Sequence, residues 1–494
     1  MRVKMRDGGG VARVLLAAIL PLAGGSAAAA DPPAREPEAR EAMGVFPIEE
    51  ESLLVIKDIP GQTIVTSREK AREVRFASRA TDRSGSERPL GVWFEGSTVF
   101  LAALPGETTP DGILRVEIPE SFGLRVEASS GTTTVDGLNG AVEVRARDAE
   151  IRCRSIGGTL EIEAERGSVS VNDGSGATIR AKGAVVSVSR PQGPILARVE
   201  GGTKLSLIEA QGDVEVEGDD AAIVAQDVTG MARVKARGGT AEFKGLRAGG
   251  EFQLAACPLK LLEGKGDITV SSDAPVSFEK MTAALHFDLY GGSLRGSLNQ
   301  GLVEVRTRNT EIVLEGIDGP LRIQGDGLNV NVSGVSGEIY VEAAVSEVTL
   351  AKAGAAVGLK IDGGSVTVRG AVGLLSATVN DGDAHLLDLT GPVALEIDGG
   401  NAEVSWTSIT GETDTLLQNT SGDVTVYFPG NASCRVEAKS KFGRVESDLP
   451  TVRVLEDGTE AQGPVGHGRR PTIKVLAEGN VRLLGGSGAP PPAE

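Results

Sequence analysis

The side chains that could carry out acid–base or metal chemistry are few and scattered along this chain. The 494 residues contain three histidines, His286, His385 and His467. Histidine titrates near neutral pH and is the commonest metal ligand, so a catalytic or metal site would need such residues close together. Their wide separation indicates no such cluster. We predict no catalytic residue, no metal ligand and no bound cofactor.

Acidic residues occur instead in short segments that contain or adjoin turn-forming residues. Asp219-Asp220, Asp362 and Asp381-Gly382-Asp383 are the kind of group that a polysaccharide lyase or hydrolase uses. Such β-helix enzymes combine clustered carboxylates with long loops, whereas these segments have the composition of turns. A calcium-binding roll needs repeated Gly-Gly-x-Gly-x-Asp runs, which Gly264-Lys265-Gly266-Asp267 and Ser421-Gly422-Asp423 only approximate. We therefore predict turn residues at the three acidic segments and no specific calcium site.

The three cysteines are too few to form a disulfide framework. Cys153 and Cys434 occupy apolar positions of alternating segments that lie far apart in the sequence, and Cys257 is the third. We predict buried thiols with no reactive or metal-binding role.

A short repeat, from about Gly123 to Pro429, contains most of these residues. A glycine recurs every 17 to 20 residues, and apolar residues follow it at fixed offsets with a period of two. In the repeat that starts at Gly140 they are Val142, Val144, Ala146, Ile151, Cys153 and Ile156. One turn of chain cannot bury its apolar side alone, so neighbouring turns must stack on it. The repeat predicts an all-β, single-chain β-solenoid (β-helix) of about 17 coils of about 18 residues.

The composition agrees with a thin aliphatic interior. Glycine is abundant, with 67 residues, and aromatic residues make up only 3%, as expected where Val, Ile, Leu and Ala fill narrow coils. Trp406 falls at an inward offset of the repeat, whereas Tyr340 and Tyr427 fall at outward offsets. An outward tyrosine can stack on a sugar, but two scattered rings are more typical of ordinary surface.

The segments on either side of the repeat have irregular spacing, and we predict β caps that cover the strand edges at both ends. The predicted parts are a signal peptide (1–30), a flexible lead-in (31–44), an N-terminal β cap (45–122), the solenoid (123–430), a C-terminal β cap (431–485) and a disordered tail (486–494). Cys257-Pro258 and Ala274-Pro275 predict the least regular repeats between Gly249 and Gly301. We expect a loop from Asp457 to Pro471.

The N-terminus has the features of a secretion signal. Basic residues precede an apolar run from Val14 to Leu22, and small residues follow up to Ala30. The run is too short to span a bilayer. Removing residues 1–30 takes away four basic residues and one acid, so the net charge changes from -18 to -21. This charge repels nucleic acid and anionic lipid. We expect a secreted protein, periplasmic or at the cell surface, without stable membrane insertion.

Several segments together suggest a family. They are Leu53–Gly61, Leu114–Glu120 leading into Leu124–Gly131, Ser421–Val426, Val445–Pro450, and Gly466–Gly468 before Ile473–Val475. This layout resembles the bacterial envelope adhesins with β-strand repeats, a domain of unknown function, over nearly all of the mature chain. The resemblance implies a single-chain β-solenoid exported to the envelope. It supplies no catalytic residues.

We therefore expect an exported, non-enzymatic β-solenoid whose side faces act as an adhesin-like or scaffold surface for an envelope protein or glycan. The alternative is a polysaccharide-acting lyase or hydrolase, which would need carboxylates clustered on two or three adjacent coils. A third possibility is the passenger of a secretion system. The absence of a following outer-membrane barrel in this chain is evidence against a passenger that transports itself.

Overall fold

The computed structural model describes residues 40–47, 52–59, 61–80, 90–103, 112–409, 411–468 and 470–486. The predicted signal peptide lies outside these residues, as do most of the lead-in, which is described only from Arg40, and residues 487–494 of the tail. The described residues form 42 strands and no helix, so they contain no helix that could span a membrane. The chain divides into two compact units, Met1–Ala241 and Glu242–Glu494.

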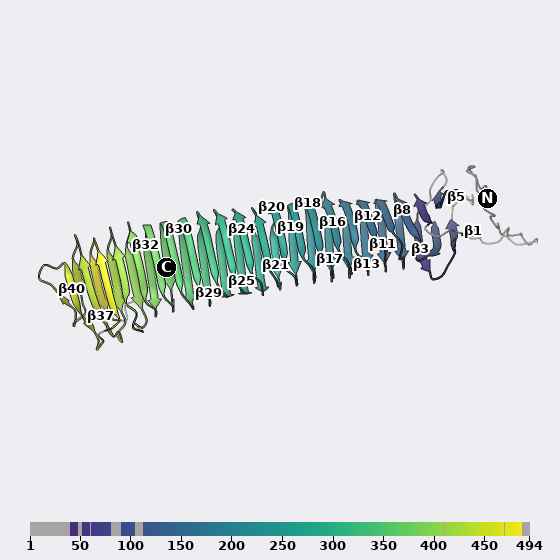
Figure 1. The fold of residues 1–494 in the computed structure, drawn as a ribbon. Coiled ribbons are helices and arrows are strands. Elements are labelled where there is room, and N and C mark those ends of the chain that lie inside the picture. The colour runs from purple at the N-terminus through teal and green to yellow at the C-terminus, as the bar shows by residue number, and fades with distance from the viewer. Residues whose placement is uncertain are drawn as a thin grey trace, which may run out of the picture. The chain divides into compact units, whose positions relative to one another are not determined.

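Both units consist of β-solenoid coils, each with two strands that belong to two separate parallel ladders (Figure 1). In the first unit, Val142 of β10 (Val142–Arg147) pairs with Leu160 of β12 (Leu160–Glu165). Val144 and Ile162, which also pair, are fully buried, whereas the residues between them point outward. This alternation confirms the predicted all-β solenoid of about 17 coils and about 18 residues a coil.

The remaining strands of the first unit repeat this arrangement. They are β8 (Gly123–Ala128), β9 (Gly131–Asp136), β11 (Ala149–Arg154), β13 (Ser168–Asn172), β14 (Ala177–Lys182), β15 (Val185–Ser189), β16 (Ile195–Glu200), β17 (Lys204–Ile208), β18 (Val214–Gln226) and β19 (Ala232–Lys244), which ends in the second unit. β8, β10, β12, β14, β16 and the start of β18 form one ladder. β9, β11, β13, β15, β17 and the end of β18 form the other.

The second unit has the same two-ladder design. Its coils are built from β20 (Gly250–Ala255), β21 (Leu259–Leu262), β22 (Ile268–Ser272), β23 (Val276–Met281), β24 (Leu285–Tyr290), β25 (Ser293–Gln300), β26 (Val303–Arg308), β27 (Glu311–Asp318), β28 (Leu321–Asp326), β29 (Asn329–Val335), β30 (Ile339–Ala353), β31 (Val357–Arg369), β32 (Leu375–Leu389), β33 (Val393–Asp398), β34 (Ala402–Trp406), β35 (Thr415–Asn419) and β36 (Val424–Phe428). The prolines at 258 and 275 lie between strands, and the adjacent coils pair in regular register. Both prolines occupy corners, which need no ladder hydrogen bond. The irregular features of this stretch are a gap in the pairing of β23 with β25 at Lys280 and an isolated bridge between Lys265 and Thr282.

The coil corners explain the recurring glycine. A Cβ at Gly158 would collide with the carbonyl oxygen of Gly140, one coil earlier, and a Cβ at Gly140 would collide with that of Phe122. Neighbouring coils therefore touch through backbone alone at this corner. Other corners hold non-glycine residues in the left-handed region, such as Asp148 at φ 52° and Arg166 at φ 61°.

The N-terminal cap changes the order of the coils. Its strands are β1 (Arg40–Pro47), β2 (Leu53–Lys57), β3 (Gln62–Arg68), β4 (Glu73–Ala80), β5 (Leu90–Glu95), β6 (Thr98–Ala103) and β7 (Ile113–Pro119). The β2–β3 coil lies between the β6–β7 coil and the β8–β9 coil, although it precedes both in sequence. Antiparallel strands complete the end: β4 pairs with β7, β1 with β4, and β5 with β6.

The C-terminal cap also changes the order of its coils, so that the last coil in sequence is not the last in the stack. Its strands are β37 (Cys434–Ser440), β38 (Val445–Ser447), β39 (Arg453–Val454), β40 (Glu460–Val465), β41 (Thr472–Ala477) and β42 (Val481–Gly485). The last coil, β41–β42, lies between the β35–β36 coil and the β37–β38 coil. β40 pairs antiparallel with β37, and β39 with β40. The predicted loop from Asp457 to Pro471 is therefore wrong where β40 lies, because this segment covers the edge of the terminal coil.

Candidate functional site

The outer side of the β8–β10–β12–β14–β16 ladder carries two rows of charged side chains. The strands are parallel and in register, so residues one coil apart lie side by side. The first row contains Glu127, Arg145, Glu163, Arg180 and Arg198. The second row contains Arg147, Glu165, Lys182 and Glu200, two residues further along each strand.

A shallow groove of about 750 Å³ runs between these rows. Its floor is formed by inward-facing alanines whose side chains are buried, Ala128, Ala146, Ala164 and Ala181. The lining contains five acids, Asp58, Glu127, Glu163, Glu165 and Glu200, and five bases, Arg145, Arg147, Arg180, Lys182 and Arg198. The groove is therefore close to neutral in charge but strongly polar, and we call it the charged groove.

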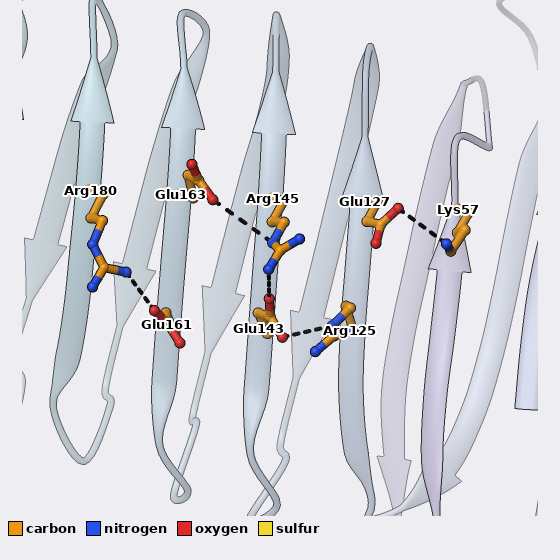
Figure 2. Close-up of polar contacts among 8 residues, drawn as sticks. All are labelled: Lys57, Arg125, Glu127, Glu143, Arg145, Glu161, Glu163 and Arg180. Carbon is orange, nitrogen blue, oxygen red and sulfur yellow. Dashed lines mark hydrogen bonds and ion pairs between the residues drawn. The ribbon is translucent and has the colours of Figure 1, made fainter. Parts of the chain in front are cut away.

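Ion pairs within strands and between neighbouring coils organise this face, and Figure 2 shows several of them. Arg145 lies between Glu143, at 2.8 Å, and Glu163, at 3.8 Å. The other pairs are Lys57–Glu127 at 3.6 Å, Arg125–Glu143 at 2.6 Å, Arg180–Glu161 at 2.6 Å, Arg147–Glu165 at 2.8 Å and Arg198–Glu200 at 3.1 Å. Exposed pairs stabilise a fold little, so their main effect is to hold the side chains in ordered rows.

The corner beside the groove has the best-formed ion pair of this face. Both Nε and Nη2 of Arg166 donate to the Asp148 carboxylate, at 2.6 Å each. This hydrogen bonding lowers the pKa of Asp148 and raises that of Arg166. Arg166 also lies 3.3 Å from Glu165, a groove residue. Arg166 thus links Glu165 of the second row to Asp148 at the corner.

Lys182 differs from the other bases of the groove. It is exposed, and among the described residues no acidic side chain forms an ion pair with it. Its ammonium therefore has donors available for a partner that enters the groove.

The other ladder of the first unit presents a different surface. Its central outward row has one charged residue, and it contains Thr134, Arg152, Ser170, Ser187 and Ser206 on successive coils. Val185 on the same side is 53% exposed. Charged side chains in register are thus concentrated on one of the two ladders.

The structure does not bring the histidines together. Nδ1 of His286, on β24, lies 3.0 Å from Glu304, and that of His385, on β32, lies 3.1 Å from Glu403. His467 lies between β40 and β41. Each of the first two therefore pairs with an acid of the next coil. Within the described residues, no group of three or more His, Cys, Asp and Glu side chains could hold a metal ion.

The acidic segments lie at corners and outward positions. Asp220 and Asp381 have positive φ, and Asp362 is exposed on β31. Asp423, in the second segment that approximates a calcium roll, accepts a hydrogen bond from the backbone N–H of Asn480 at 2.7 Å. Gly266 has φ of 83° at its corner. Asp220 and Asp381 therefore lie at bends within β18 and β32, as predicted. The predicted turns are wrong for Asp219, Asp362 and Asp383, which are paired strand residues of β18, β31 and β32.

All three cysteines are buried, as predicted. Burial raises the pKa of Cys153 to about 12 and that of Cys434 to about 11, and it also raises that of Cys257. Burial therefore disfavours the thiolate, the reactive form of cysteine, at all three positions.

The aromatic predictions are also confirmed. Trp406 is 5% exposed and its indole N–H donates to the carbonyl of Gly391, whereas Tyr340 is 39% exposed and Tyr427 half-buried. Burial is the main cause that raises the pKa of Tyr427.

Sequence reasoning missed the charged groove. The alternation of Glu143, Arg145 and Arg147 in one repeat with Glu161, Glu163 and Glu165 in the next is typical of solvated strand faces. The usable signal was that an acid in one repeat often has a base at the equivalent position of the next repeat. Such residues lie side by side only when the coils stack in register.

The fold agrees with a match to a family model. The model of Toastrack DUF4097 matches residues 203–480, more than half of the chain. The chain belongs to the Toastrack family. The match begins after the last residue that lines the charged groove, so the groove lies outside the matched part of this Toastrack chain.

Other comparisons add little to the Toastrack assignment. A crystal structure of a candidate cell adhesion protein from Clostridium sporogenes aligns over 91% of this chain and 100% of its own length, with 6% sequence identity and a TM-score of 0.15. A similarity this low carries no argument about fold or function. No curated protein matches the sequence.

Proposed function

We propose that this Toastrack protein is exported to the bacterial envelope and binds a partner along the charged groove without catalysing a reaction. The observation that carries the proposal is the pair of charged rows, in which four acids and five bases are held over a backbone floor, with Asp58 as a fifth acid of the groove lining. Rigid β-coils hold these groups at a fixed spacing of about 4.8 Å. A partner that lies along the groove can therefore make many weak polar contacts at once.

The mixed charge indicates what kind of partner fits. A purely anionic or cationic polymer would meet like charges along half of each row, which opposes binding. A partner with both amino and carboxyl groups, in an envelope protein or in a peptide-bearing glycan, can match the rows. Lys182 supplies the ammonium that has no acidic partner in the chain as described.

The test of binding is photo-crosslinking in intact source cells. A photoreactive amino acid at Ser129, an exposed groove residue, should capture a discrete partner, whereas the same group at Ser187 on the other ladder should not. Lys182→Glu should weaken this capture, and Lys204→Glu, on β17, should leave it unchanged. Equal capture at both serines, or no capture at Ser129, contradicts the proposal.

Export has a separate test. Fractionation of the source cells should place the protein outside the cytoplasm, with a mature N-terminus at Asp31. A cytoplasmic protein that retains residues 1–30 contradicts the export proposal. Release of small fragments from an envelope polymer by the purified protein would favour the polysaccharide-acting alternative.

A further inference from the structure

The outermost strand of the N-terminal cap has an unused edge. β1 pairs antiparallel with β4 along its whole length, from Arg40 opposite Ala80 to Pro47 opposite Glu73. Among the described residues no strand pairs with the other edge of β1 (Figure 1 labels it at the N-terminal end of its unit). In an antiparallel ladder alternate residues direct their N–H and C=O groups away from the partner strand. This edge therefore presents backbone donors and acceptors along eight residues.

The side chains of β1 divide between the cap interior and solvent. The Phe46 ring stacks on Phe76 with centroids 5.4 Å apart, and a Cβ at Gly44 would collide with the same Phe76 ring. Met43 and Val45 alternate with these residues and are 68% and 44% exposed. Natural proteins usually protect such an edge, because exposed backbone flanked by apolar side chains invites pairing with another strand.

Among the described residues β5, the outermost strand of the other ladder in this cap, also has one unpaired edge, six residues long. The edges at the C-terminal cap are much shorter. At the C-terminal cap the outermost strands are β39, with two residues, and β38, with three. Short edge strands of this kind are a common protection against strand pairing. β1 lacks this protection, and its charged residues, Arg40 and Glu41, lie together at one end.

The sequence of β1 suits pairing with itself. In an antiparallel pair centred on Gly44, Met43 of one chain lies opposite Val45 of the other, and the same contact occurs a second time by symmetry. Both residues lie on the outer side of the strand. We propose that β1 pairs antiparallel with β1 of a second copy of this chain, with Gly44 at the twofold axis, to form a dimer. Each copy carries a net charge of -18 in full length, so the pairing should strengthen with salt, which screens the repulsion.

The first test is sedimentation velocity of the purified full chain over a range of concentrations at low and high salt. We expect a monomer–dimer equilibrium that favours the dimer at high salt. Val45→Lys should weaken association by roughly tenfold or more, since it places like charges close together across the axis. Val185→Lys, on β15 away from this edge, should not change it. A chain that stays monomeric, or a dimer unaffected by Val45→Lys, overturns the proposal.

A second test uses single cysteine substitutions to check the register of the β1–β1 pair. It also tests the dimer if Val45→Lys disturbs folding. One preparation carries Met43→Cys and another carries Val45→Cys; the native cysteines are buried and do not compete. Under mild oxidation the mixture should form a disulfide-linked dimer far faster than either preparation alone, because the two new thiols face each other. Crosslinking that is equally slow in all three samples overturns the pairing. Rapid crosslinking of one preparation alone overturns the register. Either result leaves the charged groove untouched, so failure here is distinct from failure of the proposed function.

Discussion

The N-terminal and C-terminal caps have corresponding strand orders, related by reversal of the chain direction. In the N-terminal cap, the β2–β3 coil lies second in the stack, and the later β6–β7 coil is terminal. In the C-terminal cap, the β41–β42 coil lies second, and the earlier β37–β38 coil is terminal. In each, two antiparallel strands extend one ladder, β4 and β1 in one cap and β40 and β39 in the other. The caps differ in their edges, which are eight and six residues long at β1 and β5 but two and three at β39 and β38. The same topology thus closes both ends of the chain. The longer edge strands leave only the N-terminal cap with an edge long enough to pair with another strand.

The caps are also stabilised by different interactions. The N-terminal cap contains an aromatic cluster, in which Phe46 contacts both Phe76 and Phe94, and Trp93 stacks on Phe100 at 5.1 Å. The C-terminal cap relies more on side-chain hydrogen bonds. Asn480 donates to Asp423 of the preceding coil at 3.2 Å and accepts from the backbone N–H of Arg444 at 3.0 Å. One side chain thereby links the exchanged coil to both of its neighbours.

The largest expected effect follows from a charge inside the exchanged coil of the C-terminal cap. Val475 has no exposed surface and lies between Leu417 and Ala438. Val475→Asp should cost about 4 kcal/mol or more, because it buries a carboxylate without a partner. Limited proteolysis with mass spectrometry should show cleavage within residues 429–471 while the first unit stays intact.

The corresponding change in the N-terminal cap tests whether the exchanged coil holds that cap together as well. Val65, between Val116 and Val135, is equally buried, so Val65→Asp should open the N-terminal cap alone. If either variant remains as resistant as the native chain, the exchanged coil does not hold its cap together.

A smaller effect should follow from the aromatic cluster. Phe76 is 4% exposed, so Phe76→Ala should cost about 3–5 kcal/mol through the cavity that it leaves. Phe94 is 40% exposed, and Phe94→Ala should cost about 0.5–1.5 kcal/mol, the range for one aromatic pair. Urea unfolding followed by Trp93 fluorescence, in a Trp406→Phe background, measures both. Equal costs would show that the cluster does not act as the core of this cap.

The hydrogen bonds of Asn480 should contribute less again. Asn480→Ala should destabilise the C-terminal cap by about 1–2 kcal/mol, since it removes the side-chain hydrogen bonds to Asp423 and Arg444 at an exposed corner. Asn331→Ala is the control, because Asn331 is an exposed strand residue of the same unit. Urea unfolding followed by Trp406 fluorescence should separate the two variants. The same midpoint for both would contradict the linking role of Asn480.

The smallest effect concerns pH. Nζ of Lys439 on β37 lies 2.8 Å from Glu460 on β40, and this hydrogen bond raises the pKa of Lys439. The resulting stability is present below the unfolded lysine pKa of about 10.4 and is lost as pH rises through the folded value. In the N-terminal cap, Arg75 bonds instead to Glu73 of its own strand. The urea midpoint of the C-terminal cap should therefore exceed that of Glu460→Gln slightly near neutral pH, and the two should converge above the folded pKa. A constant difference would contradict this origin.

The coil itself could be predicted because glycine and aliphatic residues repeat at offsets that only stacking explains. The inward positions of Cys153 and Trp406 followed from the same alternation. The exchange of coils could not be predicted. Val65 and Val475 are small aliphatic residues like those of every other coil, so the pattern gives no information about which coil is the neighbour. The strand β40 was missed because Gly463 and Pro464 give it the composition of a loop.

The charged groove was missed for a related physical reason. Its character depends on which side chains lie side by side on different coils, such as Arg145 between Glu127 and Glu163. Each strand alone shows only alternating polar residues. The histidines were correctly expected to be apart, since their separation in sequence is large compared with one coil.

The exchanged coils have a consequence for the order in which the protein folds. Regular coils join residues about 18 apart, as in Val142 with Leu160, whereas the C-terminal cap joins Val424 to Val481, 57 residues later. Closing the longer loop costs about 1 kcal/mol more in chain entropy. The outer edge of the β35–β36 coil also stays uncovered until β41 and β42 have been made. During synthesis from the N-terminus, the C-terminal cap can therefore close only after residues 472–485 have emerged, later than any regular coil.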